Sequence, residues 1–247
     1  MKIVVPMAGE GSRFVQGGYT FPKPLIEVNG VPMIQAVVSN LRFDDAEYIF
    51  LVRKAHLQKF TGVEQLLHQV TNNRCKIVVV DQLTQGAACT VLLAKHLIND
   101  DDELLIANSD QLLEFSKTNF TTLKSLATTV EGLVFTFTST HPKWSFVRVN
   151  SQGHITEIVE KLPISDVATC GVYWYRRGKD FVAAAERMIE KNIRVNGEFY
   201  VAPVYNELIA AGKLVVPFYV QEMHGIGTPE DLELYLQRNK TNVTHST

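Results

Sequence analysis

The sequence predicts an α/β fold, a three-layer sandwich in which helices cover both faces of a mixed, mostly parallel central sheet. Two patterns support this prediction. In the first 130 residues, continuous apolar runs of strand length alternate with amphipathic segments, as in repeated βαβ units. After residue 130, strand-like runs follow one another more closely, which predicts antiparallel additions to the sheet in the second half.

The spacing of apolar residues along the chain predicts the individual strands and helices. In the first half, strands are expected at 2–6, 47–53, 75–81 and 103–109, and helices at 31–41, 57–70 and 86–98. In the second half, strands are expected at 132–139, 144–150, 154–161, 169–176 and 214–220, and helices at 179–191, 200–211 and 228–238. Thr228 can cap the last helix, because a proline and acidic residues follow it.

Composition limits the domain organisation and the class of partner. No linker rich in Pro, Gly or Ser interrupts the 247 residues, so one domain is expected over 1–240, with a flexible tail at 241–247. A net charge of −2 argues against broad binding of nucleic acid. Cys75, Cys89 and Cys170 have no spacing typical of disulfide frameworks or zinc sites. No apolar run is long enough for a signal peptide or membrane span, which predicts a cytoplasmic protein.

The chemistry is expected at the loop within "VVPMAGEGSRF", residues 4–14. The loop follows the first strand, at the sheet edge where ligands of α/β proteins collect. Gly9 and Gly11 let the main chain approach a phosphate closely, and Arg13 adds a charge. Lys23 stands between two prolines, which hold that cation in place. No Gly-Lys-Ser/Thr follows, and no helix is expected directly after the loop, so it is neither a Walker loop nor a dinucleotide fingerprint.

Five segments together carry a family resemblance. They are "PMAGEGSRF" with "FPKPLIEVNGVPMI", "DQLTQGAACTVLLA" (81–94), "IANSD" (106–110), "EIVEK" (157–161) and "GIGTPEDLELY" (225–235). In this order they resemble the sugar nucleotidyltransferases, the nucleoside-diphosphate-sugar pyrophosphorylases, whose signature is GxGxR, a variable gap and Pro-Lys-Pro. The resemblance implies a Rossmann-like, GT-A-like catalytic domain without the β-helix domain of bifunctional relatives. Its nucleotide-binding half would cover about 1–130 and its acceptor-binding half about 131–240.

The resemblance also implies an activity. Such an enzyme transfers a nucleoside monophosphate from a nucleoside triphosphate to a phosphorylated acceptor and releases pyrophosphate, with Mg²⁺ as cofactor. A pyrimidine nucleotide is favoured, with CTP ahead of UTP and dTTP, because Gln82 could read a pyrimidine edge. A sugar 1-phosphate is the expected acceptor, for capsule or other surface polysaccharide, and a phosphorylated non-sugar stays open. Neither a nucleic acid nor a membrane is an expected partner, and a homodimer is the common default.

The site residues carry over onto matching positions. The resemblance implies Arg13, Lys23, Asp110 and Lys161 as catalytic residues, with Asp110 as the metal ligand. The expected nucleotide-binding residues are Ala8, Gly9, Glu10, Gly11, Ser12, Arg13, Lys23, Gln82 and Gly86. The expected acceptor-binding residues are Trp144, Glu160, Lys161, Gly171 and Glu198. In-line phosphoryl chemistry needs positioning and charge rather than a covalent intermediate, which agrees with a set rich in cations.

One departure keeps two alternatives open. Many family members carry a second metal-binding Asp where Gly225 stands here, so Asp110 is left as the strong protein ligand. This loss favours a degenerate nucleotide-binding regulatory subunit as one alternative. The other is a glycosyltransferase that uses a nucleotide-sugar, although such enzymes often have Asp-x-Asp at the metal, where Asn108 stands in this chain. That alternative would also leave Arg13 and Lys23 unexplained.

Overall fold

One continuous sheet runs through this computed structural model. Within residues 1–244, the part of the chain that the structure describes, nine strands join in it. Along the main path their order is β10-β9-β11-β6-β1-β4-β5, and β8 and β12 extend the sheet from β11. The strands are β1 Lys2–Pro6, β4 Glu47–Arg53, β5 Cys75–Val80, β6 Leu104–Ala107, β8 Val130–Thr138, β9 Ser145–Val149, β10 Ile155–Glu160, β11 Val167–Tyr175 and β12 Leu214–Tyr219.

The first half supplies the parallel strands. β6, β1, β4 and β5 lie side by side in that order and run in the same direction. Their alternate side chains enter two different cores, because Ile3 and Val5 of β1 pack into one and Val4 packs into the other. All three side chains are buried. A strand that is buried on both faces needs apolar residues at successive positions, which explains the continuous apolar runs.

The second half adds strands that are mainly antiparallel. β11 is antiparallel to β6, β8 and β9, and therefore links the two halves of the sheet. β9 and β10 also pair antiparallel, whereas β12 runs parallel to β8. The predicted α/β sandwich, with a mixed sheet and antiparallel additions in its second half, is confirmed.

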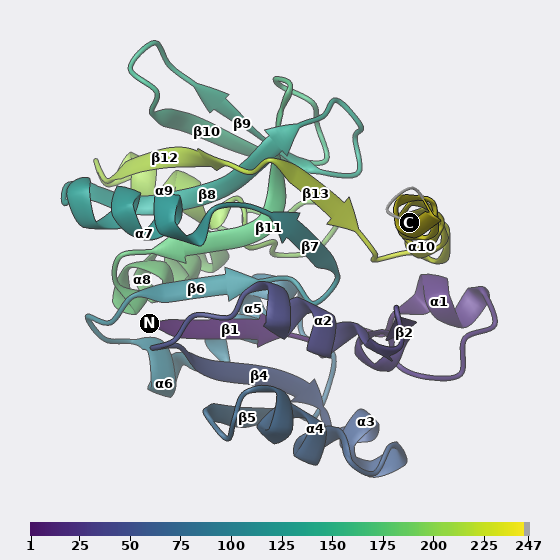
Figure 1. Cartoon of the computed structure of the whole chain (residues 1–247). Coiled ribbons are helices and arrows are strands. Elements are labelled where there is room, and N and C mark those ends of the chain that lie inside the picture. The colour runs from purple at the N-terminus through teal and green to yellow at the C-terminus, as the bar shows by residue number, and fades with distance from the viewer. Residues whose placement is uncertain (245–247) are drawn as a thin grey trace.

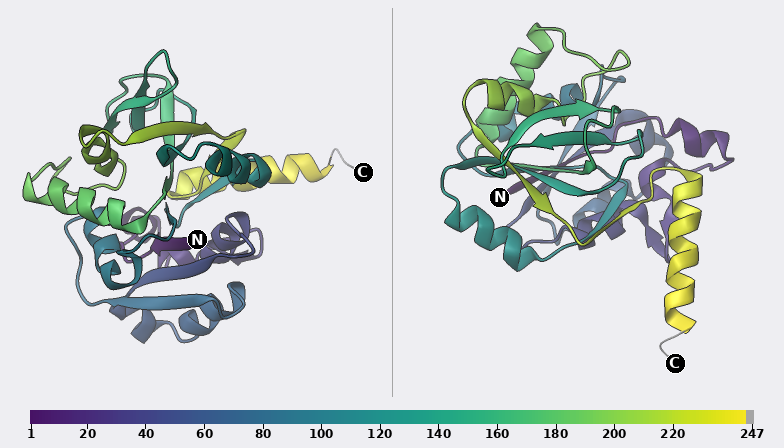
Figure 2. Two further views of the ribbon diagram at one scale, coloured as in Figure 1. Left: turned by 90° about the vertical axis from the view of Figure 1, so that its left-hand side faces the viewer. Right: turned by 90° about the horizontal axis from the view of Figure 1, so that it is seen from above.

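Helices cover both faces of this sheet (Figure 1). Apolar residues of α2, α4 and α7 join the core that contains Ile3, and those of α5, α8 and α9 join the core that contains Val4. Helix α10 extends away from the body of the molecule (Figure 2). The helices are α1 Ser12–Gln16, α2 Met33–Asn40, α3 Lys54–Lys59, α4 Val63–Val70, α5 Ala87–Leu92, α6 Lys95–Ile98, α7 Lys117–Leu126, α8 Gly178–Glu190, α9 Val204–Ala210 and α10 Pro229–Thr244, with a 3-10 turn η1 at Lys23–Leu25.

Two small sheets stand outside the main one. They are β2 Glu27–Val28 with β3 Val31–Pro32, and β7 Gln111–Glu114 with β13 Glu222–Gly225. The helix predicted at 31–41 begins only at Met33, after the β2–β3 pair. Residues 31–32 instead form a strand, and the turn before it uses Asn29 and Gly30, both with positive φ. Asn-Gly is a strong signal for a tight hairpin turn, and here it outweighs the helical period.

Three other predicted helices have different limits. The helix predicted at 57–70 is divided into α3 and α4, because Gly62 adopts a left-handed φ of 93° between them. The helix predicted at 86–98 is likewise divided into α5 and α6. The helix predicted at 200–211 starts only at Val204. In all three cases the helical segments lie within or near the predicted range, but the helix is divided or shortened.

One expectation at the loops is wrong, and the last helix is longer than predicted. A short helix, α1, begins directly after Gly11, where the sequence predicts none. The last helix continues past residue 238 to Thr244, so residues 241–244 of the predicted flexible tail are helical. Residues 245–247 lie outside the described part of the chain.

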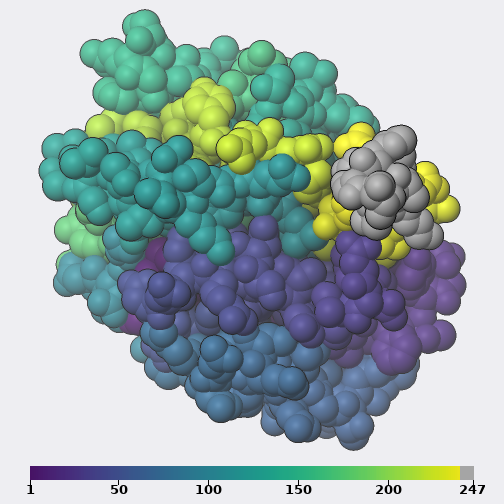
Figure 3. Space-filling model, viewed as in Figure 1, coloured from purple at the N-terminus to yellow at the C-terminus, as the bar shows by residue number. Residues whose placement is uncertain are grey.

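The parallel strands end on one side of the molecule. In Figure 1, β1, β4 and β6 point to the right, toward α1 and the start of α10. The space-filling view shows the first half of the chain in the lower part and the second half above it (Figure 3). The edge between them at the carboxyl ends of the strands is where a ligand site is expected. Among the helices of residues 1–244, we find none with the length and apolarity needed to cross a bilayer.

Candidate active site

Two joined cavities lie at the carboxyl ends of the parallel strands. The larger has a volume of about 500 Å³ and the smaller a volume of about 310 Å³. Lys23, Asp110 and Tyr200 line both, so the cavities form one continuous cleft. Arg13 and Lys161 line the larger cavity. The cleft therefore brings together the four residues that the sequence predicts to be catalytic.

The glycine loop closes one side of this cleft. Gly11 precedes α1 with a φ of 63°, and a Cβ at this position would lie 3.2 Å from the Cβ of Lys23. A larger residue would strain the backbone and crowd the lysine. A Cβ at Gly9 would meet no described atom within 4 Å, and its φ is not left-handed. Gly11 is therefore required by conformation, whereas Gly9 keeps the wall of the cleft open.

An ion pair lies where the two cavities meet. The Nζ of Lys23 is 2.7 Å from Oδ2 of Asp110, and the two side chains are 24% and 18% exposed. Lys23 opens the turn η1 directly after Pro22, whose ring fixes φ at −60°. Asp110 lies between β6 and β7. Both charges are partly withdrawn from water, so each interacts more strongly with a neighbouring charge than it would at the surface.

The backbone makes room for the Asp110 carboxylate. The N–H of Ile226 donates to the carbonyl oxygen of Asp110 over 2.9 Å, which ties the segment after β13 to the end of β6. A Cβ at Gly227 would lie 2.4 Å from Oδ2 of Asp110, which is too close for any contact. Gly227 thus forms a cradle for the carboxylate, and any side chain there would displace it.

Buried polar side chains form the floor of the larger cavity. They include Ser145, Glu160, Thr169 and Tyr173. The hydroxyl of Ser145 donates to the Glu160 carboxylate, and the hydroxyls of Thr169 and Tyr173 lie 3.1 Å apart. Burial raises the pKa of the Glu160 carboxyl, while the Ser145 hydrogen bond and the charge of Lys161 oppose that rise. Buried polar groups are costly unless they are paired, so this floor suits a polar ligand.

Lys161 is held in an unusual conformation at the side of the larger cavity. Its φ is 57°, a left-handed value that is costly for any residue with a Cβ. Its N–H donates to the carbonyl of Trp144 over 3.0 Å, and its Nζ donates to the Tyr200 hydroxyl over 2.5 Å. Burial and the nearby Glu198 raise the pKa of Tyr200, so its hydroxyl stays neutral. The strained backbone and Tyr200 together fix the ammonium group at the cleft.

A second lysine and carboxylate line the same cavity. The Nζ of Lys143 is 2.8 Å and 3.0 Å from the two carboxylate oxygens of Asp231, in the first turn of α10. The same Nζ lies 4.7 Å from the ring centre of Trp144. A Cβ at Gly225 would be 3.2 Å from the Trp144 ring and 3.9 Å from Oδ2 of Asp231. These side chains thus occupy the space beside Gly225.

Comparison with known proteins identifies the family. A family model described as nucleotidyl transferase matches residues 2–234. The chain belongs to the nucleotidyl transferase family. This confirms the resemblance found in the sequence.

The chain has individual relatives known by structure or by sequence. It is 27% identical to a nucleoside-diphosphate-sugar pyrophosphorylase from Vibrio cholerae RC9, with a TM-score of 0.81 over 95% of this chain and 99% of that one. An inositol-1-phosphate CTP transferase from T. maritima is 15% identical, with a TM-score of 0.73 over 95% of this chain and 93% of that one. The bifunctional protein GlmU of Methanococcus aeolicus is 25% identical over 94% of this chain. The chain spans about half, 53%, of that relative's length.

Most of the residues predicted from the sequence lie along the cleft. The larger cavity is lined by Gly9, Gly11, Ser12, Arg13, Lys23, Asp110, Trp144, Glu160, Lys161, Gly171 and Glu198. Ala8 and Gly86 line the smaller cavity. Two predicted nucleotide-binding residues line neither: Glu10 is exposed and pairs with Arg53 over 3.4 Å, and Gln82 is exposed. Gln82 lies next to Leu83 and Thr84, which do line the smaller cavity, and its expected role at the base stays a prediction.

Several cleft residues were not predicted from the sequence. They are Asn108, Gln111, Lys143, Ser145, Thr169, Tyr173, Tyr200 and Asp231. A period of two along β11 was the available signal for some of them, because Thr169, Gly171 and Tyr173 face the same cavity. Gln111 carries a buried Oε1 with no hydrogen-bond partner among the described residues, and a Cβ at Gly171 would lie 2.0 Å from it. Gly171 also has a φ of 71°, a left-handed value that favours glycine.

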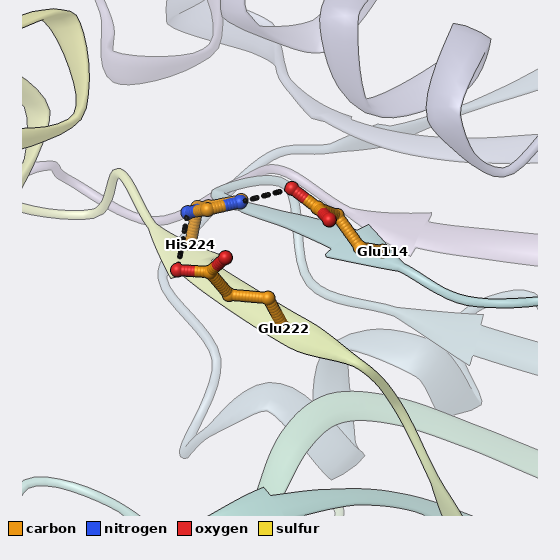
Figure 4. A group of neighbouring side chains, drawn as sticks. All are labelled: Glu114, Glu222 and His224. Carbon is orange, nitrogen blue, oxygen red and sulfur yellow. Dashed lines mark hydrogen bonds and ion pairs between the residues drawn. The ribbon is translucent and has the colours of Figure 1, made fainter. Parts of the chain in front are cut away.

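Among the described residues, a cluster of three possible metal ligands lies outside the lining of the cleft. Figure 4 shows His224 between Glu114 and Glu222, at the pairing of β7 with β13. The ring nitrogen Nε2 is 3.0 Å from a Glu114 oxygen, whereas Nδ1 is 3.8 Å from a Glu222 oxygen. One possible ligand atom from each of the three side chains lies within 4.8 Å of the other two, but each ring nitrogen already has a carboxylate oxygen as its partner. The arrangement fits a histidine that bridges two strands rather than a metal centre.

Proposed function

We propose that this protein transfers a nucleotidyl group from a nucleoside triphosphate to a phosphorylated acceptor and releases pyrophosphate. The nucleotide we propose is a pyrimidine, CTP first and UTP or dTTP next. The acceptor is a sugar 1-phosphate, whose activated product would serve capsule or other surface polysaccharide. The observation that carries the proposal is the meeting of Arg13, Lys23, Asp110 and Lys161 in one cleft.

The two cavities suit the two substrates. The smaller is lined by Ala8, Gly86 and neighbouring main chain, and small residues there leave room for a nucleoside. The larger has a polar floor around Glu160, which suits the hydroxyl groups of an acceptor. Lys23 and Asp110 line both, so the triphosphate would cross from one cavity to the other beside them.

The charges suit in-line transfer. An acceptor phosphate oxygen attacks the α-phosphorus while the bond to pyrophosphate breaks, so no enzyme nucleophile is needed. Two polyanions repel each other, and Lys161 would hold the acceptor phosphate against that repulsion. Arg13 and Lys23 would hold the triphosphate and offset the charge that grows on the leaving pyrophosphate. Each of these side chains is a cation at the cleft, which supports its role.

The cleft also fits a divalent cation. Mg²⁺ prefers oxygen ligands, takes one or two carboxylates and completes its shell with phosphates and water. Asp110 provides such a carboxylate, and the cradle at Gly227 keeps its oxygen exposed to the cleft. When bound, Mg²⁺ would neutralise phosphate charge and align the reacting groups.

A pyrophosphate-release assay tests the proposal. The protein is mixed with Mg²⁺, each of CTP, UTP, dTTP, GTP and ATP, and a panel of sugar 1-phosphates and non-sugar phosphates. We expect release that requires both a nucleotide and an acceptor, with a pyrimidine preferred. Lys161→Ala should raise the KM for the acceptor, whereas Lys179→Ala, at an exposed surface pair with Asp101, should not.

Three outcomes would contradict the proposal. Folded protein that releases no pyrophosphate with any pair of substrates would exclude it over that panel. Sugar transfer from a nucleotide-sugar without pyrophosphate would indicate a glycosyltransferase. Tight nucleotide binding without turnover would indicate a regulatory subunit.

A further inference from the structure

We propose that Asp231 is the second carboxylate of the divalent-cation site, in the same cavity as Asp110. It would replace the aspartate that Gly225 lacks. The inference deepens the proposed function and rests on it for the identity of the cation, but it is argued from the positions of these side chains alone.

The argument begins with the segment that leaves β13. Gly225 and Gly227 are two residues apart, and both line the larger cavity. A Cβ at Gly227 would lie 2.4 Å from Oδ2 of Asp110, and a Cβ at Gly225 would lie 3.9 Å from Oδ2 of Asp231. Each glycine therefore approaches one carboxylate, so the two carboxylates lie along the same short piece of backbone. Gly225 has no side chain, and the carboxylate beside it comes from Asp231 in the first turn of helix α10.

The space beside Gly225 gives a second reason. A Cβ there would be 3.2 Å from the indole ring of Trp144, which is closer than most real contacts. An aspartate at 225 would have to push the ring aside, and its carboxylate would stand next to that of Asp231. In this chain, Trp144 and Asp231 therefore fill the place of the missing side chain, and only Asp231 brings an oxygen ligand to it.

The charges form two similar pairs. Asp110 is paired with Lys23 over 2.7 Å, and Asp231 is paired with Lys143 over 2.8 Å. All four side chains line the larger cavity. Carboxylates that bind a cation would release these lysines toward the phosphates of the substrates. The cation would then replace the lysines as the partner of the two carboxylates. The substrate phosphates would replace the carboxylates as the partners of the two lysines.

Asp231 has a structural role that the experiment must separate. Its N–H donates to Oγ1 of Thr228 over 3.1 Å, and its carboxylate holds Lys143 against the start of α10. Loss of these contacts could change activity without any change in cation binding. The decisive measurement is therefore cation affinity rather than turnover.

Terbium luminescence provides that measurement. Tb³⁺ is a hard cation that binds carboxylates, and an indole sensitises its emission only at close range. Trp144 lies beside Gly225, whereas the other tryptophan, Trp174, is fully buried in the core. Excitation of tryptophan in the native protein should give Tb³⁺ emission that saturates and that Mg²⁺ reverses. Trp144→Phe should abolish the emission, while calorimetry still detects Tb³⁺ binding.

The variants then test the ligands. Asp231→Asn and Asp110→Asn should each weaken Tb³⁺ binding by about 10- to 100-fold, the scale seen when metal sites lose a supporting group. Asp101→Asn, which removes an exposed carboxylate paired with Lys179, should leave the affinity unchanged. His224→Ala tests the outer cluster, and it too should leave the sensitised emission unchanged.

The proposal is overturned if Asp231→Asn binds Tb³⁺ like the native protein, or if the native protein gives no emission sensitised by Trp144. Its failure is distinct from that of the proposed function. If Asp231→Asn keeps the native Tb³⁺ affinity and the native protein releases pyrophosphate, the proposed function stands and Asp231 is not a cation ligand. If the variants lose Tb³⁺ affinity as expected but the native protein releases no pyrophosphate with any substrate pair, the cation site stands and the proposed activity does not.

Discussion

The two sides of the cleft are built differently. The side made by the first half of the chain consists of turns that follow parallel strands, with Gly11, Lys23 and Asp110 as its main features. The side made by the second half consists of side chains that stand on strands or next to them, such as Ser145 and Glu160. Turns offer main-chain amides and glycines, whereas strand faces offer a rigid set of side chains.

This difference indicates how the two substrates would be recognised. A triphosphate has the same shape in every nucleotide, so main-chain donors and a few fixed cations are sufficient to hold it. An acceptor is distinguished by its own hydroxyl groups, which require donors and acceptors at fixed places. We call the first side, with Gly11, Lys23 and Asp110, the phosphate side, and expect substitutions there to affect the reaction with any acceptor. We call the second side, with Ser145 and Glu160, the acceptor side, and expect substitutions there to affect acceptor choice.

The largest effect is expected at the phosphate side. Arg13→Ala should lower kcat by about 10²- to 10³-fold, the scale for removal of one preorganised group that stabilises charge. Arg148→Ala, at an exposed pair with Glu157 away from the cleft, should change kcat little. Steady-state pyrophosphate release with several acceptors checks this. A loss that occurs with one acceptor only would break the proposed division between the two sides.

The second-largest effect is expected where Gly86, in the first half of the chain, contacts Phe199 in the second half. Gly86 has a φ of 128°, and a Cβ there would lie 2.5 Å from the carbonyl oxygen of Phe199. Gly86→Ala should lower the free energy of unfolding by about 3 kcal/mol, because backbone strain and steric overlap add. Gly62→Ala is the matched control, since its φ is 93° but no described atom lies within 4 Å, and it should cost about 1 kcal/mol. Equal losses in urea unfolding would mean that the Phe199 contact is readily relaxed.

A smaller effect is expected at Lys161, on the acceptor side. Lys161→Gly should be more stable than Lys161→Ala by about 1 kcal/mol, because glycine adopts the φ of 57° without strain. Both variants lose the ammonium group and should raise the acceptor KM equally. Urea unfolding combined with steady-state kinetics separates strain from charge. Equal stability would show that the left-handed backbone at this position carries no measurable cost.

The smallest effect is expected for the pH dependence that Glu160 contributes. Burial raises the pKa of this carboxyl, so the folded protein keeps a proton that the unfolded chain loses near pH 4.3. Stability from this group is therefore present at low pH and is lost as the pH rises from the unfolded value through the folded one. Glu160→Gln removes that dependence. The native protein should lose stability relative to the variant as pH rises, measured by urea unfolding, and a constant difference would contradict the prediction.

The phosphate side was the more predictable of the two because its signals are local. The order of strands and helices, the glycine loop and the position of Asp110 after a buried strand can all be read from short stretches of sequence. Even here, Gln82 is exposed and lines neither cavity, since a loop residue's direction depends on how the loop packs, and its expected role at the base stays a prediction. Helix limits also failed at Gly62, where one local backbone angle outweighs a correct apolar period.

The acceptor side depends on contacts between distant parts of the chain. Lys161 and Tyr200 are 39 residues apart, and Lys143 and Asp231 are 88 apart. The family motif identified Lys161, but no motif named its partner or the lysine that faces Asp231.

By itself, then, the sequence determined the α/β class, the glycine loop and the cations and carboxylate that follow strand ends, because each of these depends on neighbours in the chain. Only the tertiary structure decided which polar side chains share the acceptor floor and which carboxylate lies beside Gly225. β11 pairs with three different strands, and strand alternation sets which face a side chain takes but not which distant residue it meets.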